Sequence, residues 1–441
     1  MMSEDQLRVI IVGAGPIGLY MAHALQRAGV GFIVLEQRDA ILNTAGQVLF
    51  VWPQTVRLFD QLGLLQPLGE VAMRLHSKRR ICGNTGRVLT SSEFWNHMYE
   101  NHGYPFLPIL RYDLVRIMYE HLQDHKSLVM KEAQVVGVES SASGAKVTLK
   151  NGTVVHGTIV IGADGVHSRT RALMQLARGQ STSSNEKRTM TPNYRGIFGR
   201  ASNSELNIEP GVLFESRGAG SVIQCLSTKD DVRFVTITPQ PLETSSTQEQ
   251  YSLEDKDKYV ATIADVKVLP SVTFADIWKD ADRSAAVLVE QEEGFLDVWY
   301  HHRIVLVGDA VHKTTSVNGL GLNCGMHSAA ALANQLHGLH ERPASDISII
   351  ALQEAFGKYQ NAREAECRTI WQQGCNAARD MTTVSRVNWF WDNYVLPWVD
   401  IEGFAKGILV SLLLIRHGQI LNLIRFDDKS GKIAWLNKHG R

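Results

Sequence analysis

Three glycines and one glutamate near the N-terminus have the residue types and the spacing that bind a dinucleotide. Gly13, Gly15 and Gly18 follow an apolar run from Val9 to Val12, and Glu36 lies 18 positions after Gly18. In this pattern the first glycine makes a tight turn, the second lets the backbone approach a pyrophosphate, and the third lets helix and strand pack closely. A carboxylate at the last position binds the hydroxyls of an adenosine ribose and disfavours a ribose with a 2′-phosphate. The stretch therefore predicts a site for FAD or NAD rather than NADP.

To hold these residues, the chain must form a strand, a glycine turn, a helix and a second strand in succession. The apolar patterns predict a buried strand over Val9 to Val12, a helix over Pro16 to Ala28 and a strand over Gly31 to Leu35. The place of the glycines between strand and helix, with the acid in register, favours a dinucleotide fold over a chance glycine turn in another βαβ unit. The fold class is therefore α/β, with a Rossmann-like nucleotide-binding domain.

Two turns later in the chain combine glycine with aspartate, and each follows an apolar run of the buried-strand type. Asp164 stands in the motif GADG after the run Thr158 to Ile161, and Asp309 stands in the motif GDA after the run Arg303 to Val307. Open α/β sheets bind ligands at the carboxyl ends of their strands. Asp309 is therefore well placed for ligand contact.

After the GDA motif, the passage from Asn318 to Asn323 is rich in glycine and leads into a long helix. We predict that helix from about Gly325 to Leu336, and another from Ile350 to about Gln373. We therefore expect the glycine-rich passage to form the connection before the first of these helices.

The composition changes along the chain indicate four segments. A Ser/Thr-rich stretch over 180–191 separates a first nucleotide-binding part, 1–190, from an inserted β-rich substrate domain, 191–298. The nucleotide-binding domain returns over 299–380, and a helical, apolar tail covers 381–441. We therefore expect a discontinuous nucleotide-binding domain with a β-rich insertion.

Charge and cysteine usage exclude several classes of function. The 45 basic and 45 acidic side chains cancel, so no net field draws the 441-residue chain to nucleic acid. The five cysteines form no CxxC motif and no metal-ligand spacing, so we expect buried free thiols, a reducing compartment and no metal. Glu4 and Asp5 stand where a signal peptide needs basic residues, which favours a cytoplasmic protein.

The C-terminal tail is rich in aromatic and apolar residues. Its apolar run, Gly407 to Ile415, is too short to cross about 30 Å of hydrocarbon, which takes roughly 20 residues in a helix. Two interpretations remain open, a packed helix and a helix that contacts a membrane surface. Several aromatic residues crowd the segment before this run: Trp389, Phe390, Trp391, Tyr394 and Trp398.

Three motifs in this order, GAGPIG from Gly13, GADGVHSRTR from Gly162 and GDAVHK from Gly308, resemble those of the FAD-dependent, aromatic-hydroxylase-like (class A) monooxygenases. Within that family the chain is most similar to fungal enzymes that epoxidise or hydroxylate terpenoid, meroterpenoid and indole-alkaloid intermediates. The resemblance covers roughly Arg8 to Leu336. It implies an FAD-binding domain of the glutathione-reductase type and resolves the choice between FAD and NAD in favour of FAD.

The resemblance also implies a role for each matching residue. Glu36 would hold the adenosine ribose, Arg111 the pyrophosphate and Asp309 the ribityl hydroxyls, while the backbone N–H groups of Gly321 and Leu322 would border the flavin. Asp164 would maintain the loop at the pyrophosphate while its neighbours contact NADPH as a transient co-substrate.

Arg195 resembles the arginine that some relatives direct at the flavin as a proton donor or orienting group, although one arginine on a strand is commonly a salt-bridged side chain. Three positions depart from the family pattern: Ser316 replaces a frequent proline, Leu320 replaces a frequent glutamine, and Gly46 begins an altered small-residue motif. The loop on the flavin side is therefore expected to differ in shape.

The reaction that the resemblance implies is insertion of one oxygen atom into a bulky apolar secondary metabolite. NADPH would reduce the flavin, O2 would add at C4a, and the hydroperoxide would deliver its oxygen, with water kept away from it. Two alternatives remain open: an FAD-dependent reductase or oxidase of the same fold, and a non-enzymatic prenyl-binding module. Incorporation of labelled oxygen into the product distinguishes a monooxygenase from the reductase or oxidase. A colourless purified protein, without flavin, would indicate the prenyl-binding module.

Overall fold

The computed structural model describes residues 7–42, 47–180, 190–240, 251–340, 342–343, 347–383, 387, 390, 394–395 and 406–439. Several features of the sequence lie outside the described residues. These are Gly46, most of the Ser/Thr-rich stretch over 180–191, and Trp389, Trp391 and Trp398 of the tail.

A six-stranded sheet carries the nucleotide motifs. Its order is β19-β20-β11-β1-β2-β7, and all neighbours pair in parallel except β19 with β20. Val9, Ile10 and Ile11 of β1 are fully buried, as expected for a central parallel strand covered on both faces. The strands are β1 (Arg8–Val12), β2 (Gly31–Leu35), β7 (Val129–Met130), β11 (Ile159–Gly162), β19 (Tyr300–His301) and β20 (Ile304–Leu306).

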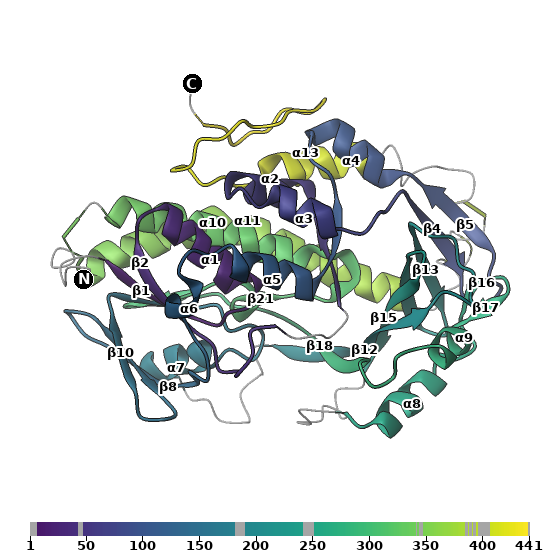
Figure 1. Cartoon of the computed structure of the whole chain (residues 1–441), viewed down its shortest axis with the longest axis horizontal. Coiled ribbons are helices and arrows are strands. Elements are labelled where there is room, and N and C mark those ends of the chain that lie inside the picture. The colour runs from purple at the N-terminus through teal and green to yellow at the C-terminus, as the bar shows by residue number, and fades with distance from the viewer. Residues whose placement is uncertain are drawn as a thin grey trace.

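Helices and a small sheet cover the two faces of this parallel sheet. Figure 1 shows α1, α5, α10 and α11 on one side, and α7 with the three-stranded antiparallel sheet β10-β9-β8 on the other. The sheet strands are β8 (Val135–Ser140), β9 (Ala145–Leu149) and β10 (Val154–Gly157). The helices are α1 (Pro16–Arg27), α5 (Arg111–Glu120), α7 (Arg169–Ala177), α10 (Leu320–His340) and α11 (Ile349–Thr382).

An eight-stranded sheet forms the second half of the molecule, with α8 (Leu253–Ala261) and α9 (Phe274–Lys279) on its outer face (Figure 1). Five of its strands come from the predicted insertion, but two come from residues 77–92, inside the predicted first nucleotide-binding part. The sheet therefore extends beyond the segment 191–298. In spatial order its strands are β21 (His312–Lys313), β18 (Val287–Phe295), β12 (Thr191–Ser202), β15 (Asp231–Pro239), β14 (Ser221–Ser227), β13 (Val212–Gly218), β4 (Ser77–Cys82) and β5 (Val88–Ser92).

Helix α10 begins earlier than the glycine content of its first turn suggested. It starts at Leu320 rather than near Gly325, so Gly321 and Leu322 lie in its first turn. Asn323 stabilises this start, because its side-chain amide donates to the carbonyl oxygens of Gly319 at 2.7 Å and Phe50 at 2.9 Å. Tertiary contacts thus outweigh the low helix propensity of glycine.

The C-terminal residues pack onto the nucleotide-binding half, over the short helices α2 (Pro53–Gln61), α3 (Leu65–Val71) and α4 (Phe94–His102) (Figure 1). Helix α13 (Lys406–Leu413) lies on α4, where Ser411 accepts a hydrogen bond from Asn101 at 3.1 Å. Arg57 of α2 pairs with Asp428 at 2.7 Å. The interpretation of the tail as a packed helix is thus supported, and contact with a membrane surface stays a prediction. No helix within the described residues has the length and apolar character to cross a membrane.

Candidate functional site

The first glycine motif forms the turn that its spacing predicts. Gly13 has a φ of +102°, and a Cβ on Gly13 would lie 2.7 Å from the carbonyl oxygen of Ala163. A Cβ on Gly18 would lie 1.9 Å from the carbonyl oxygen of Gly13, so helix α1 meets the turn with no room for a side chain. At Gly15 a Cβ would meet no protein atom within 4 Å. The space at Gly15 is thus open to a ligand, while the other two glycines serve the fold.

Glu36 lies at the end of β2, next to this turn. Its Oε2 accepts the backbone N–H of Ala14 at 2.9 Å, and its Oε1 accepts the N–H of Arg38 at 3.0 Å. Each carboxylate oxygen can accept further hydrogen bonds. Glu36 therefore fixes the turn and still offers acceptors to a pair of ribose hydroxyls.

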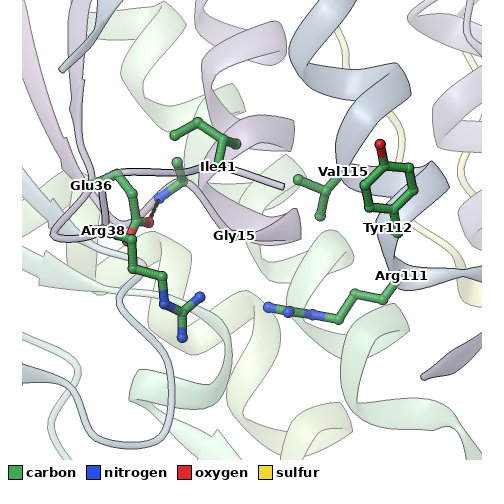
Figure 2. A pocket seen from close by; sticks show the side chains of 8 residues that line it. Gly15, Glu36, Arg38, Ile41, Arg111, Tyr112 and Val115 are labelled. Carbon is green, nitrogen blue, oxygen red and sulfur yellow. Dashed lines mark hydrogen bonds between the residues drawn. The ribbon is translucent and has the colours of Figure 1, made fainter. Parts of the chain in front are cut away.

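Two guanidinium groups face each other across the pocket below Gly15 (Figure 2). One belongs to Arg38, two residues after Glu36, and the other to Arg111, the first residue of α5. Within the described part of the chain, neither side chain makes a hydrogen bond or an ion pair. Burial lowers the pKa of Arg111, and the positive charge of Arg38 lowers it further. Two cations that converge without an anion between them indicate an anionic ligand, as a pyrophosphate is.

The GADG turn lies beside the glycine turn, because β11 pairs with β1 in parallel. Asp164 accepts hydrogen bonds from the hydroxyl of Ser168 at 2.6 Å and from the backbone N–H of Thr170 at 2.9 Å, at the start of α7. Arg171 of α7 donates to the carbonyl oxygens of Val166 at 2.6 Å and Ala310 at 3.2 Å. These contacts join the GADG and GDA turns, and they are consistent with the structural role predicted for Asp164.

Asp309 stands in the short 3₁₀ helix η2 (Gly308–Ala310), which follows β20. Its Oδ2 accepts from Lys313 Nζ at 2.9 Å. Its Oδ1 accepts no hydrogen bond from the described residues, and about a third of the side chain, 34%, is exposed. The carboxylate therefore keeps an acceptor for a hydroxyl group of a ligand.

The first turn of α10 supplies backbone N–H groups at the far end of the site. Gly319 has a φ of +60° and ends the 3₁₀ helix η3 (Ser316–Asn318), and α10 begins at the next residue. The first N–H groups of a helix have no partner within it. Gly321 and Leu322 thus have backbone N–H groups that could serve a ligand, and their role at the flavin edge stays a prediction.

An aromatic wall adjoins this turn, and no pattern in the sequence predicted it. It comprises Phe50, Trp52, Phe94, Trp95 and Phe106, with Trp95 stacked on Phe106 at 4.0 Å between ring centroids. A Cβ on Gly319 would lie 3.1 Å from Phe50. The indole N–H groups of Trp52 and Trp95 are buried and have no partner in the described part of the chain. Phe50, Phe94 and Trp95 are half-buried, so the wall keeps part of its flat apolar surface open.

Arg195 is not brought together with these residues. It lies on β12, opposite Glu290 of β18, and its Nη2 is 3.8 Å from Glu290 Oε1. Its guanidinium lies 5.1 Å from the ring centroid of Tyr251, just before α8. The neighbouring Tyr194 points to the opposite face, where it packs with Val317 of η3 and Met381 of α11. The catalytic role of Arg195 stays a prediction.

The residues present fit FAD at the nucleotide end of the site. An open space at Gly15, a ribose-binding carboxylate and two converging guanidinium groups match a dinucleotide diphosphate. Sequence reasoning missed Arg38, although its position two residues after Glu36 was a usable signal. The pocket is lined by Ala14, Gly15, Glu36, Arg38, Ile41, Arg111, Tyr112 and Val115.

Comparisons with known proteins agree with this geometry. The model of the family described as FAD binding domain matches residues 6–346. The FAD-dependent monooxygenase srdH of Neurospora crassa is 50% identical over 442 residues, which cover 98% of this chain and 99% of that protein. The FAD-dependent monooxygenase ausM of Penicillium brasilianum is 30% identical over 412 residues, which cover 92% of this chain and 85% of that protein.

Solved structures show the same fold at lower identity. HpxO of Klebsiella pneumoniae, complexed with FAD and uric acid, has a TM-score of 0.75 and 20% identity, and the match covers 92% of this chain and 97% of that one. FqzB has a TM-score of 0.72 at 17% identity, over 93% of each chain. These likenesses show a mixed α/β FAD-binding monooxygenase fold.

Proposed function

Since this chain belongs to the family described as FAD binding domain and is an FAD-dependent monooxygenase of the class A, aromatic-hydroxylase-like kind, we propose that it uses NADPH to insert one oxygen atom into a bulky, largely apolar secondary metabolite. The insertion would be an epoxidation or a hydroxylation of a terpenoid or alkaloid intermediate. The observation that carries the substrate class is the aromatic wall beside the first turn of α10.

Residues that follow three strands, together with the start of α10, would hold the cofactor. Glu36 would accept from the adenosine ribose, and Arg38 and Arg111 would neutralise the pyrophosphate between them. Asp309 would accept from a ribityl hydroxyl, and the N–H groups at the start of α10 would donate to the flavin edge, where negative charge collects on reduction. Bound FAD supplies the redox chemistry that activates O2.

The aromatic wall supports a large apolar substrate. Burial of flat rings against aromatic side chains provides most of the binding free energy of such ligands. The same wall would keep water away from the reacting atoms. Water must be excluded if the activated oxygen is to reach the substrate.

NADPH would approach through the loop that follows Asp164. His167 of that loop and Arg169, the first residue of α7, are exposed, and His167 Nε2 lies 3.4 Å from Glu292 Oε1 on the eight-stranded sheet. A transient co-substrate needs such an accessible polar surface rather than a second glycine fingerprint.

The decisive experiment is turnover under ¹⁸O2. The purified protein, with FAD and NADPH, is supplied with apolar terpenoid and indole-terpenoid intermediates, and products are analysed by mass spectrometry. We expect consumption of NADPH and O2 together, and one ¹⁸O atom in the product. Turnover that oxidises or reduces a substrate without ¹⁸O incorporation would show an oxidase or reductase instead. A variant at the wall, Trp95→Ala, should keep its FAD and raise KM for the substrate.

A further inference from the structure

A buried cluster of two cysteines and one histidine joins α10, α11 and β21, next to the residues predicted to border the flavin. Cys324 follows Asn323 on α10, Cys367 lies on α11, and His312 stands three residues after Asp309. Their sulfur and ring nitrogen atoms all lie within 4.8 Å of one another. The cluster is separate from the pocket at Gly15, and the proposed reaction does not use it.

The two sulfur atoms are in contact, and their surroundings shift the two thiol pKa values in opposite directions. The Cys324 thiol donates to Cys367 Sγ at 3.3 Å. Burial raises the pKa of Cys367, but the hydrogen bond from Cys324 and the positive charges of His312 and Arg363 hold it well below its usual range. The same hydrogen bond, together with burial, raises the pKa of Cys324. Cys367 is therefore the sulfur that loses its proton more readily, and Cys324, which donates to it, is placed to act as the resolving thiol.

The surroundings favour sulfur chemistry over metal binding. The fully buried guanidinium of Arg363 donates to Cys367 Sγ at 3.7 Å, and Glu366 accepts from the same guanidinium. Ser328 also lies against Cys367, with its Oγ 3.5 Å from Sγ. A fixed positive charge thus compensates the thiolate, and a divalent cation at this point would be repelled by it.

We propose that Cys324 and Cys367 form a reversible disulfide when the protein meets hydrogen peroxide. The thiolate sulfur of Cys367 attacks one peroxide oxygen, the O–O bond breaks, and the departing hydroxide takes a proton from His312 and leaves as water. The sulfur of Cys324 then attacks the sulfenic acid on Cys367, and its proton leaves with the hydroxide as a second water. The two thiol groups together lose two electrons, which reduce one peroxide molecule to water.

Oxidation of the two cysteines would affect the end of the site predicted to border the flavin. The disulfide would tie the first turns of α10, which carry Gly321 and Leu322, to the long helix α11. Hydrogen peroxide is also the by-product expected when reduced flavin reacts with O2 in the absence of substrate. The protein's own flavin as the source of peroxide therefore rests on the proposed function. Oxidation of the two cysteines does not rest on it, because hydrogen peroxide from any source can react with them.

The test adds hydrogen peroxide directly to the full-length holoprotein after reduction and removal of the reductant. Samples are denatured in the presence of N-ethylmaleimide, which alkylates free thiols, and are then digested and analysed by mass spectrometry. We expect a peptide pair joined through Cys324 and Cys367 that lacks two hydrogen atoms, disappears with dithiothreitol, and forms before oxidation of the partly exposed Cys82. The cross-link should also raise the midpoint of thermal unfolding, because it restricts the unfolded chain.

Three variants and one ion complete the test. Cys375→Ser changes another α11 cysteine and should leave the cross-link intact, whereas Cys324→Ser should leave a sulfenic acid on Cys367 that dimedone captures. If both cysteines are alkylated by N-ethylmaleimide after peroxide has oxidised Cys82, the proposal is wrong. It is equally overturned if the wild-type protein, given ZnCl2 alone, retains one zinc per chain that Cys367→Ser loses. The peroxide experiment on the wild-type protein tests the proposal even if a variant fails to fold.

Discussion

The carboxylate of Glu36 accepts the backbone N–H of Ala14 at 2.9 Å, and this contact joins the end of β2 to the glycine turn after β1. The residue predicted to bind the adenosine ribose thus also fixes the turn that approaches the pyrophosphate. Loss of the carboxylate therefore affects two parts of the cofactor site, although Glu36 is one residue.

We expect Glu36→Ala to weaken FAD binding by about 10- to 100-fold, because each hydrogen bond to a charged group contributes about 1.5–3 kcal/mol. Flavin fluorescence during titration of the cofactor-free protein gives the Kd. Asp39→Ala, which removes an exposed acid three residues further on, should leave the Kd unchanged. Equal affinity in Glu36→Ala and the wild type would contradict the placement of the ribose.

The glycines of the first motif provide a paired test of fold against ligand. Gly18→Ala places a methyl group 1.9 Å from the Gly13 carbonyl, so it should destabilise the cofactor-free protein by about 1–3 kcal/mol. Gly15→Ala meets no protein atom and should leave that stability within about 0.5 kcal/mol. It should nevertheless weaken FAD binding, because the methyl group occupies the approach of the pyrophosphate.

Urea unfolding of the cofactor-free variants measures stability, and flavin fluorescence measures binding. The prediction fails if Gly15→Ala binds FAD as the wild type does, since the space at Gly15 would then be unrelated to the cofactor.

Arg195 tests whether a residue on the outer face of the sheet takes part in catalysis. If it does, Arg195→Ala should keep bound FAD and lose product, and Arg195→Lys should recover part of kcat. Arg200→Ala is the matched control, because Arg200 lies on the same strand and pairs with Asp282 at 3.0 Å on the surface. An Arg195→Ala enzyme with unchanged kcat and lowered thermal stability would show that the arginine serves its contacts with Glu290 and Tyr251 alone.

The nucleotide-binding βαβ unit could be predicted almost to the residue because its determinants are local. The helix predicted to end at Ala28 ends at Arg27, and the strand over Gly31 to Leu35 has its predicted bounds. Glycine spacing and a short apolar run are sufficient for these elements, and no distant contact is required.

Features that depend on distant contacts could not be predicted in the same way. Arg38 and Arg111 converge only because α5 packs beside the glycine turn, and Cys324 meets Cys367 only because α10 and α11 are neighbours. The start of α10 was misplaced because Asn323, through contacts with Phe50 and Gly319, stabilises a turn that glycine disfavours.

Strand pairing across the chain also brings Glu215 beside two distant cations, in addition to Arg217 on its own strand. Glu215 lies on β13, and β4 pairs with β13 in parallel, which brings Lys78 to 3.0 Å and Arg80 to 3.6 Å from its carboxylate. Arg217 is 2.9 Å away. Burial raises the pKa of Glu215, but the three cations hold it well below its usual range.

Glu215→Gln should lower the free energy of unfolding by about 3 kcal/mol at neutral pH, because the cations lose a buried anion. The folded pKa lies below the unfolded one, so this stabilisation is complete above the ordinary glutamate pKa and is lost as the pH falls through the folded value. Urea unfolding of both proteins should therefore give a difference that shrinks with acidification. Glu209→Gln, which removes a half-exposed partner of Arg79, should cost less than about 1 kcal/mol. A Glu215→Gln difference that stays constant with pH would contradict the assignment of an ionised Glu215.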